Sequence, residues 1–164
     1  MKPDSKRPAT TETYDLMPQG SFDMHKLIAL KAEADTLRDG IMRFWQERSE
    51  DTKYGGFLTN FDEQGRDMGT PEKYLNTQCR LIWTFSALLR THRNAEYERL
   101  ARQGVDFLIT HLWDEEWGGF YWKCNRDGSR LDDGKIVYGE SFAIYALSEY
   151  YIATGDPRGL DYAC

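Results

Sequence analysis

One stretch of the sequence occurs twice, 63 residues apart, and this repeat constrains the fold more than any other feature. The segment DTKYGGFLTNFDEQG begins at Asp51, and DEEWGGFYWKCNRDG begins at Asp114. The similarity continues downstream at an offset of 62, where Lys73 aligns with Lys135. A fixed period of this length is typical of repeat proteins, whose units cannot bury their apolar faces alone. The chain is therefore expected to fold as stacked copies of one unit.

Composition and charge restrict the classes of partner. With 40 % hydrophobic and 29 % charged residues, the chain has a globular composition. Its formal net charge of −6 argues against nucleic acid or an anionic membrane surface as the main partner. We find no secretory signal and no membrane-span candidate. The three cysteines, Cys79, Cys124 and Cys164, lack metal-ligand spacing, so free thiols in a reducing, cytoplasmic compartment are expected.

Apolar periodicity predicts helices on both sides of each repeated loop. Residues 1–22 are polar and are expected to form a flexible tail ahead of a domain at residues 23–164. Pro71 suits the first turn of a helix, and Gly155 followed by Pro157 suits a helix end. Apolar residues recur every three or four positions in segments that run from about Met24 to Arg48, Lys73 to His92, Ala95 to His111, and Ile136 to Ala153.

The two Gly-Gly-Phe segments are expected to form short hairpin loops, because glycine permits the positive φ that such turns need. Each repeat then consists of a helix, a hairpin loop and a second helix. The helices that follow the loops are the more apolar and aromatic of each pair. We therefore assign these helices to an inner ring and the others to an outer ring.

Five segments in order resemble one enzyme family over about residues 24–164. They are YGGF from Tyr54, NTQCRLIWTFS from Asn76, LWD from Leu112, WGGFYW from Trp117 and KIVYGESFAIYALSEYY from Lys135. The chain resembles the N-acylglucosamine 2-epimerase family, which includes cellobiose 2-epimerases and mannose isomerases. The resemblance implies an all-α fold, the (α/α)6 toroid of helical hairpins. Six such units need roughly 380 residues, so about two and a half hairpins from the N-terminal part of a toroid are expected.

The resemblance also implies a chemistry. Enzymes of this family epimerise or isomerise free sugars without a cofactor, by moving the proton on C2 of an open-chain aldose. Such a reaction needs a base of near-neutral pKa and a hydrogen-bonding group for the developing oxyanion. Arg80 matches the arginine of the family's Gln-x-Arg segment, which contacts the sugar oxygens around the reacting carbon. Arginine suits this role because it stays charged and offers several donors; without the motif, a solvated surface residue would be the simpler interpretation.

Four further residues are candidates for substrate binding. Tyr138 matches a pocket tyrosine of the family and aligns with Asn76 of the first repeat, although a half-buried core ring with a solvated hydroxyl is an equal alternative. Glu140 aligns with Gln78, and an acid favoured by the helix dipole is the alternative interpretation. Trp83 could stack on a sugar face. For Trp83, as for Trp117 and Trp122, a core position is the favoured interpretation.

The family's acid/base histidines do not appear in this sequence. They lie in later repeats, whereas this chain has only His25, His92 and His111. His92 and His111 are expected at helix ends, where a cation complements the helix dipole. No metal-binding cluster is apparent either. The chain is therefore expected to be inactive on its own.

Two alternatives from other classes remain open. Helical toroids also host glycoside hydrolases, which need two carboxylates beside the scissile bond. Asp62, Asp114, Asp132 and Asp133 lie near the loops and could supply them, although such loops commonly carry Asp for turn chemistry. The other alternative is a non-catalytic fragment that self-associates through an apolar edge expected after about Tyr151.

Overall fold

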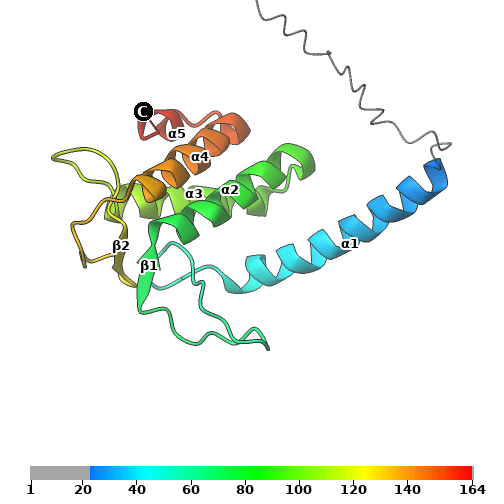
Figure 1. The fold of residues 1–164 in the computed structure, drawn as a ribbon, viewed down its shortest axis with the longest axis horizontal. Helices are drawn as coiled ribbons and strands as arrows, with labels where there is room; N and C mark the ends of the chain where they lie inside the picture. Colours follow the sequence, from blue (N-terminus) through cyan, green and yellow to red (C-terminus); the bar gives the residue numbers. More distant parts are fainter. Residues whose placement is uncertain (1–22, 164) are drawn as a thin grey trace, which may run out of the picture. The chain divides into compact units, whose positions relative to one another are not determined.

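The computed structural model describes residues 23–163, which form five helices and two short strands. The predicted tail, residues 1–22, lies outside the described residues. The chain divides into two units, residues 1–37 and 38–164. In chain order the elements are α1 (Met24–Arg48), β1 (Glu72–Tyr74), α2 (Leu75–His92), α3 (Ala95–His111), β2 (Lys123–Asn125), α4 (Val137–Thr154) and α5 (Arg158–Asp161) (Figure 1).

The described part of the first unit is the N-terminal portion of α1. Asp23 begins this helix, because its carboxylate accepts a hydrogen bond from the backbone N–H of His25 at 3.0 Å. That contact satisfies one of the N–H groups that a helix start leaves without a partner. Most of its large apolar side chains are exposed, namely Met24, Leu27, Ile28, Leu30 and Leu37.

In the second unit, α2 packs against both α3 and α4, and α3 makes few contacts with α4 (Figure 1). Ile82 and Phe85 of the apolar stripe expected for α2 are fully buried at the centre of the core, together with Leu75 at the start of the helix. Complete burial of one such side chain contributes about 1.5–3 kcal/mol. α3 adds Leu100 and Leu108 from the other side. α2 is thus the element around which the second unit is built.

The start of α2 differs from the sequence prediction, which placed Lys73 in the helix with Pro71 in its first turn. Residues 72–74 instead form β1, which pairs antiparallel with β2 so that Lys73 lies opposite Cys124. The backbone N–H of Leu75 then donates to the carbonyl of Trp122 at 2.9 Å. These inter-repeat hydrogen bonds hold the segment extended, and the helix begins two residues later than predicted.

The other predicted helix ends agree with the structure within two residues. α1 and α3 have the predicted bounds, and α4 ends at Thr154, followed by Gly155, whose φ of 73° suits glycine. Cys79 and Cys124 are buried free thiols, as expected, and burial raises the pKa of Cys124 to about 11. Cys164 lies outside the described residues. None of the helices described is long and apolar enough to cross a membrane.

Candidate functional site

The first Gly-Gly-Phe loop is held by a buried lysine. The Lys73 ammonium donates to the Asp51 carboxylate at 3.0 Å and also to the carbonyl oxygen of Gly55. The Asp51 carboxylate in turn accepts hydrogen bonds from the backbone N–H groups of Lys53 and Tyr54. Lys73 and Asp51 are therefore the polar centre of this loop.

The second loop reproduces the same network. The Lys135 ammonium donates to the Asp114 carboxylate at 2.5 Å and to the carbonyl oxygen of Gly118 at 2.5 Å. The Asp114 carboxylate accepts from the N–H groups of Glu116 and Trp117. The spacing that aligns Lys73 with Lys135 thus reflects one repeated hydrogen-bond network.

Gln78 and Glu140 connect each loop to the helix that follows it. The Gln78 side chain accepts from the N–H of Phe57 at 2.7 Å and donates to its carbonyl at 2.9 Å. Glu140 accepts from the N–H of Phe120 at 2.8 Å. The Glu140 carboxylate therefore supports the second loop, and a sugar contact by Glu140 stays a prediction.

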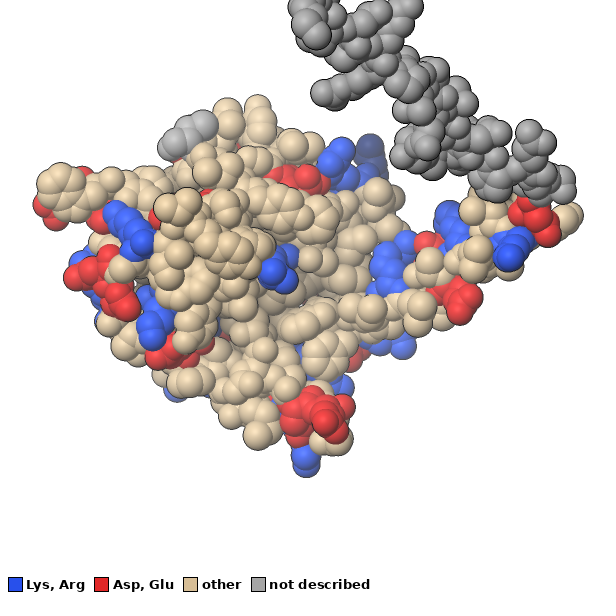
Figure 2. All heavy atoms as spheres, in the orientation of Figure 1, with Lys and Arg blue, Asp and Glu red and all other residues tan. Residues whose placement is uncertain are grey.

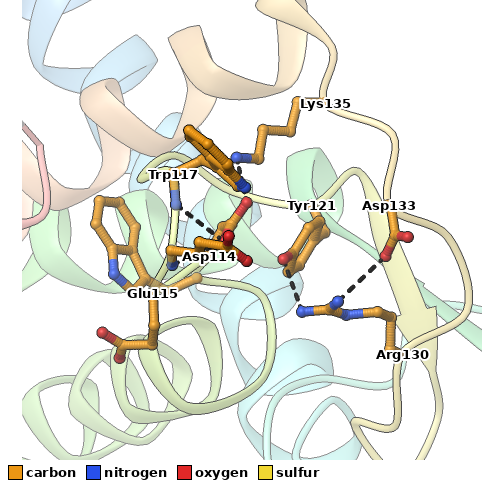
Figure 3. A pocket seen from close by; sticks show the side chains of 9 residues that line it. Asp114, Glu115, Trp117, Tyr121, Arg130, Asp133 and Lys135 are labelled. Carbon is orange, nitrogen blue, oxygen red and sulfur yellow. Dashed lines mark hydrogen bonds and ion pairs between the residues drawn. The ribbon is translucent and has the colours of Figure 1, made fainter.

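The two loops differ in how they are covered. The Lys73 side chain is 0 % exposed, because the ring of Phe107 lies 4.4 Å from its ammonium and Arg126 also pairs with Asp51 at 2.9 Å. The Lys135 side chain is 29 % exposed. Next to it lies a hollow that Trp113, Asp114, Glu115, Glu116, Trp117, Tyr121, Arg130, Asp133 and Lys135 line (Figure 3).

This hollow is where the second loop lacks the cover that Phe107 and Arg126 give to the first. Figure 3 shows Arg130 reaching both the Tyr121 hydroxyl, at 2.6 Å, and Asp133. We interpret the hollow as the uncovered side of a structural loop.

The self-association that the sequence analysis considered, through an apolar edge after about Tyr151, stays a prediction.

Both loop aspartates titrate well below the usual range. Burial by itself would raise the pKa of Asp51, but the hydrogen bonds from Arg126 and Lys73 outweigh it and lower that pKa to about 2. The hydrogen bond from Lys135 is the main cause that lowers the pKa of Asp114 to about 2. Because both carboxylates stay ionised at neutral pH, neither is suited to act as a general acid.

These shifts predict that the protein loses stability in acid. The folded-state pKa of about 2 lies below the unfolded value of about 3.9, so each carboxylate contributes fully above pH 4. That contribution disappears as the pH falls from about 4 to 2. Urea unfolding followed by circular dichroism should show a shallower decline for Asp114→Asn than for wild type. An exposed control, Asp133→Asn, should keep the wild-type slope, and equal slopes for all three proteins would contradict the assignment.

Four of the candidate residues lie on the neighbouring helices α2 and α4, within three pairs of residues that share a repeat position; they are Asn76, Arg80, Trp83 and Tyr138. Asn76 corresponds to Tyr138 near the two helix starts. One turn further along, the Arg80 guanidinium lies over the ring of Phe142, 4.9 Å from its centroid. Trp83 and Tyr145 then stack with centroids 4.9 Å apart and planes 13° from parallel. The two helices therefore present one continuous polar and aromatic face, which we call the α2–α4 face.

Arg80 is exposed on the α2–α4 face and has no carboxylate partner among residues 23–163. Figure 2 shows that the surface over α2 and its surroundings is mostly uncharged in this view. Most other arginines of the second unit are ion-paired, as Arg90 is with Glu149 at 2.9 Å. The guanidinium N–H donors of Arg80 therefore remain available for oxygen atoms of a ligand.

The aromatic candidates take different positions. Tyr138 is 52 % exposed and contacts Phe142 edge to face, with ring centroids 4.9 Å apart. Trp83 and Trp122 are half-buried. Trp117 is 79 % exposed, so its predicted core position is wrong. Its backbone N–H donates to the Asp114 carboxylate, and its indole lies at the rim of the hollow in Figure 3.

Sequence reasoning missed Phe142 as a residue of the α2–α4 face. The repeat alignment, which places Phe142 opposite Arg80, was the signal that could have found it.

His92 and His111 lie at helix ends in the described fold. His92 is the last residue of α2, as expected, and twelve residues of helix place it about 18 Å from Arg80 along the axis. His111 ends α3 and packs against Phe107, with ring centroids 4.8 Å apart. His25 lies near the start of α1. Residues 23–163 contain no group of side chains suited to hold a metal ion.

The aspartates considered for glycoside hydrolysis are engaged in the loops. Asp62 accepts from the N–H groups of Gln64 and Arg66 and pairs with the Arg66 guanidinium at 2.7 Å. Asp132 accepts from the N–H of Gly134 at 2.6 Å, and Asp133 pairs with Arg130 at 3.3 Å. These contacts match the turn chemistry that was the alternative interpretation of these residues.

The repeated helix–loop–helix unit, whose second helices α2 and α4 pack on each other, is typical of the α/α toroid class. Residues 55–163 match the family model described as N-acylglucosamine 2-epimerase (GlcNAc 2-epimerase). The chain belongs to this family. This result confirms the family and the all-α toroid predicted from the sequence.

Individual relatives agree with the family match. A cellobiose 2-epimerase of Bacteroides fragilis is 41 % identical over 123 residues, which cover 75 % of this chain and 31 % of the relative. The human N-acylglucosamine 2-epimerase is 31 % identical over a region that covers 83 % of this chain and 34 % of the relative. The solved cellobiose 2-epimerase of Spirochaeta thermophila superimposes with a TM-score of 0.80 and 32 % identity, covering 88 % and 36 %. The chain thus spans about a third of these relatives.

Proposed function

We propose that the α2–α4 face is the sugar-recognition part of a carbohydrate 2-epimerase that acts on a free aldose. The observation that carries this proposal is Arg80, an exposed arginine that has no carboxylate partner among residues 23–163 and lies over the ring of Phe142. Aromatic rings suit the apolar faces of a sugar, and guanidinium donors suit its oxygens. The relatives are named for cellobiose and N-acylglucosamine, and both sugars end in an aldose with a proton on C2.

The proposed chemistry needs no cofactor. A base takes the C2 proton of the open-chain sugar, the C–H electron pair forms a C1–C2 double bond, and the carbonyl electrons move to O1. The Arg80 N–H groups stabilise the negative charge that develops on this oxygen. Protonation of C2 from the opposite face then gives the epimer. Tyr138, Asn76 and Trp83 would contact the remainder of the sugar.

We further propose that the 164-residue chain alone recognises a sugar but does not epimerise it. The support is the position of His92, which lies too far from Arg80 to share a substrate carbon with it, and of His111, which packs within α3 and its loop. A general base must come within hydrogen-bond reach of the proton that it removes.

The test combines a binding titration with an exchange assay. Titration of the isotope-labelled chain with D-mannose, D-glucose and cellobiose should give saturable NMR shifts confined to α2 and α4. Arg80→Gln should weaken the affinity at least about tenfold, since a charged hydrogen bond contributes about 1.5–3 kcal/mol. Arg90→Gln, an exposed arginine on the same helix, should bind as wild type does. In D2O, none of the three proteins should exchange the C2 proton of the sugar for deuterium.

The two parts of the proposal fail separately. Absence of saturable binding, or equal affinities for wild type and Arg80→Gln, would overturn the recognition role. Exchange of the C2 proton at an enzyme-like rate by the wild-type chain would overturn the proposed inactivity while leaving the recognition role intact.

A further inference from the structure

We propose that Phe142 is a positioning residue for Arg80, and that it sets the sugar affinity of the α2–α4 face through the guanidinium rather than by direct contact. This inference rests on the proposed function. The starting observation is that the Arg80 guanidinium lies over the ring of Phe142, 4.9 Å from its centroid. A guanidinium over an aromatic face is held by the ring quadrupole while its N–H edges stay free.

The repeat explains why these two side chains meet. Arg80 and Phe142 lie 62 residues apart, the same offset that relates Trp83 to Tyr145. Each pair occupies one position on two packed helices, so the packing of α2 against α4 brings both pairs together. The parallel stack of Trp83 and Tyr145 is independent evidence that this register is held.

The ring of Phe142 is itself fixed by its neighbours. Tyr138 contacts it edge to face with centroids 4.9 Å apart, and Tyr145 lies 6.3 Å away with its plane at 83°. Both neighbours lie on α4, at sequence distances that place them one turn before and after Phe142. The ring is therefore braced along its own helix, and its remaining face is open to Arg80 on α2.

Fixing the guanidinium matters because a free arginine side chain samples many rotamers. Ordering such a side chain on binding opposes association. A salt bridge would order it too, but a carboxylate would occupy the donors that a sugar needs. An aromatic face orders the side chain and leaves all five N–H groups available. The arrangement therefore suits a neutral, oxygen-rich ligand.

The first experiment needs no sugar. In the wild-type chain, ring current from Phe142 should shift the Arg80 Nε–H proton upfield, and its heteronuclear NOE should report a restrained side chain. Phe142→Leu should return the proton to the position of a free arginine and lower the NOE. Phe142→Tyr should restore both. Tyr151→Leu, which removes an exposed aromatic elsewhere on α4, should change neither. An unchanged Arg80 signal in Phe142→Leu would overturn the inference.

The second experiment separates positioning from direct sugar contact by a double-mutant cycle. Phe142→Leu should weaken sugar affinity about threefold, the fold-change of an exposed cation–π contact. In the Arg80→Gln background, the same change should have no effect. A loss of equal size in both backgrounds would show that Phe142 contacts the sugar itself and would overturn the inference. If wild type binds no sugar, the proposed function fails, and the Arg80 signal still decides whether Phe142 positions the guanidinium.

Discussion

Lys73→Met is expected to lower the free energy of unfolding by about 3 kcal/mol, whereas Lys135→Met should lower it by less than about 1 kcal/mol. The two lysines make the same contacts in the two repeats, with an aspartate and a glycine carbonyl. They differ in burial, at 0 % and 29 % exposed. Removal of a fully buried partner leaves Asp51 and the Gly55 carbonyl short of a donor that water cannot replace.

Burial also lowers the pKa of Lys73, and the pairing with Asp51 opposes that effect. The ion pair therefore fixes the loop conformation more than it adds net stability. The expected loss of unfolding free energy arises because Asp51 and the Gly55 carbonyl are left buried without the lysine donor. Urea unfolding of both variants by circular dichroism would measure the difference directly. Equal losses for Lys73→Met and Lys135→Met would contradict the role given to burial.

Sequence reasoning aligned Lys73 with Lys135 but assigned no role to either. The reason is physical: the role depends on contacts with Asp51 and Gly55, which are 22 and 18 residues away. The same limit explains the start of α2. A proline near an apolar run favours a helix start, but pairing between β1 and β2 uses backbone hydrogen bonds from the other repeat, and no local pattern reports them.

Periodicity predicted the helices well, because their apolar stripes arise from local spacing alone. It predicted less of the candidate site. Arg80 and Tyr138 were chosen from motifs, but their neighbour Phe142 was not. The repeat alignment related the two residues, since Arg80 and Phe142, like Trp83 and Tyr145, are 62 positions apart and meet where α2 packs on α4. For Trp117 the sequence suggested a core position, but the side chain is exposed. A tryptophan in an aromatic loop is buried only where another element covers the loop.

Gly104 of α3 packs closely against two side chains of the first repeat. A β-carbon on Gly104 would lie 2.6 Å from the Phe57 ring and 2.7 Å from Ile82, both of which are fully buried. These distances are well inside van der Waals contact, so both core side chains would have to move. Gly40, in α1, is the matched control, because a β-carbon there has nothing within 4 Å.

Gly104→Val is expected to lower the free energy of unfolding by about 3 kcal/mol, at the upper end for an overpacked core. Gly40→Val should change it by only a few tenths, because valine and glycine differ little in helix propensity. The difference between the two variants therefore isolates the packing of α3 on Phe57 and Ile82. Gly104→Ala should fall between them and provides a measurable protein if the valine variant does not fold. Urea unfolding curves that match for Gly104→Val and Gly40→Val would show that α3 is not held against the first loop as described.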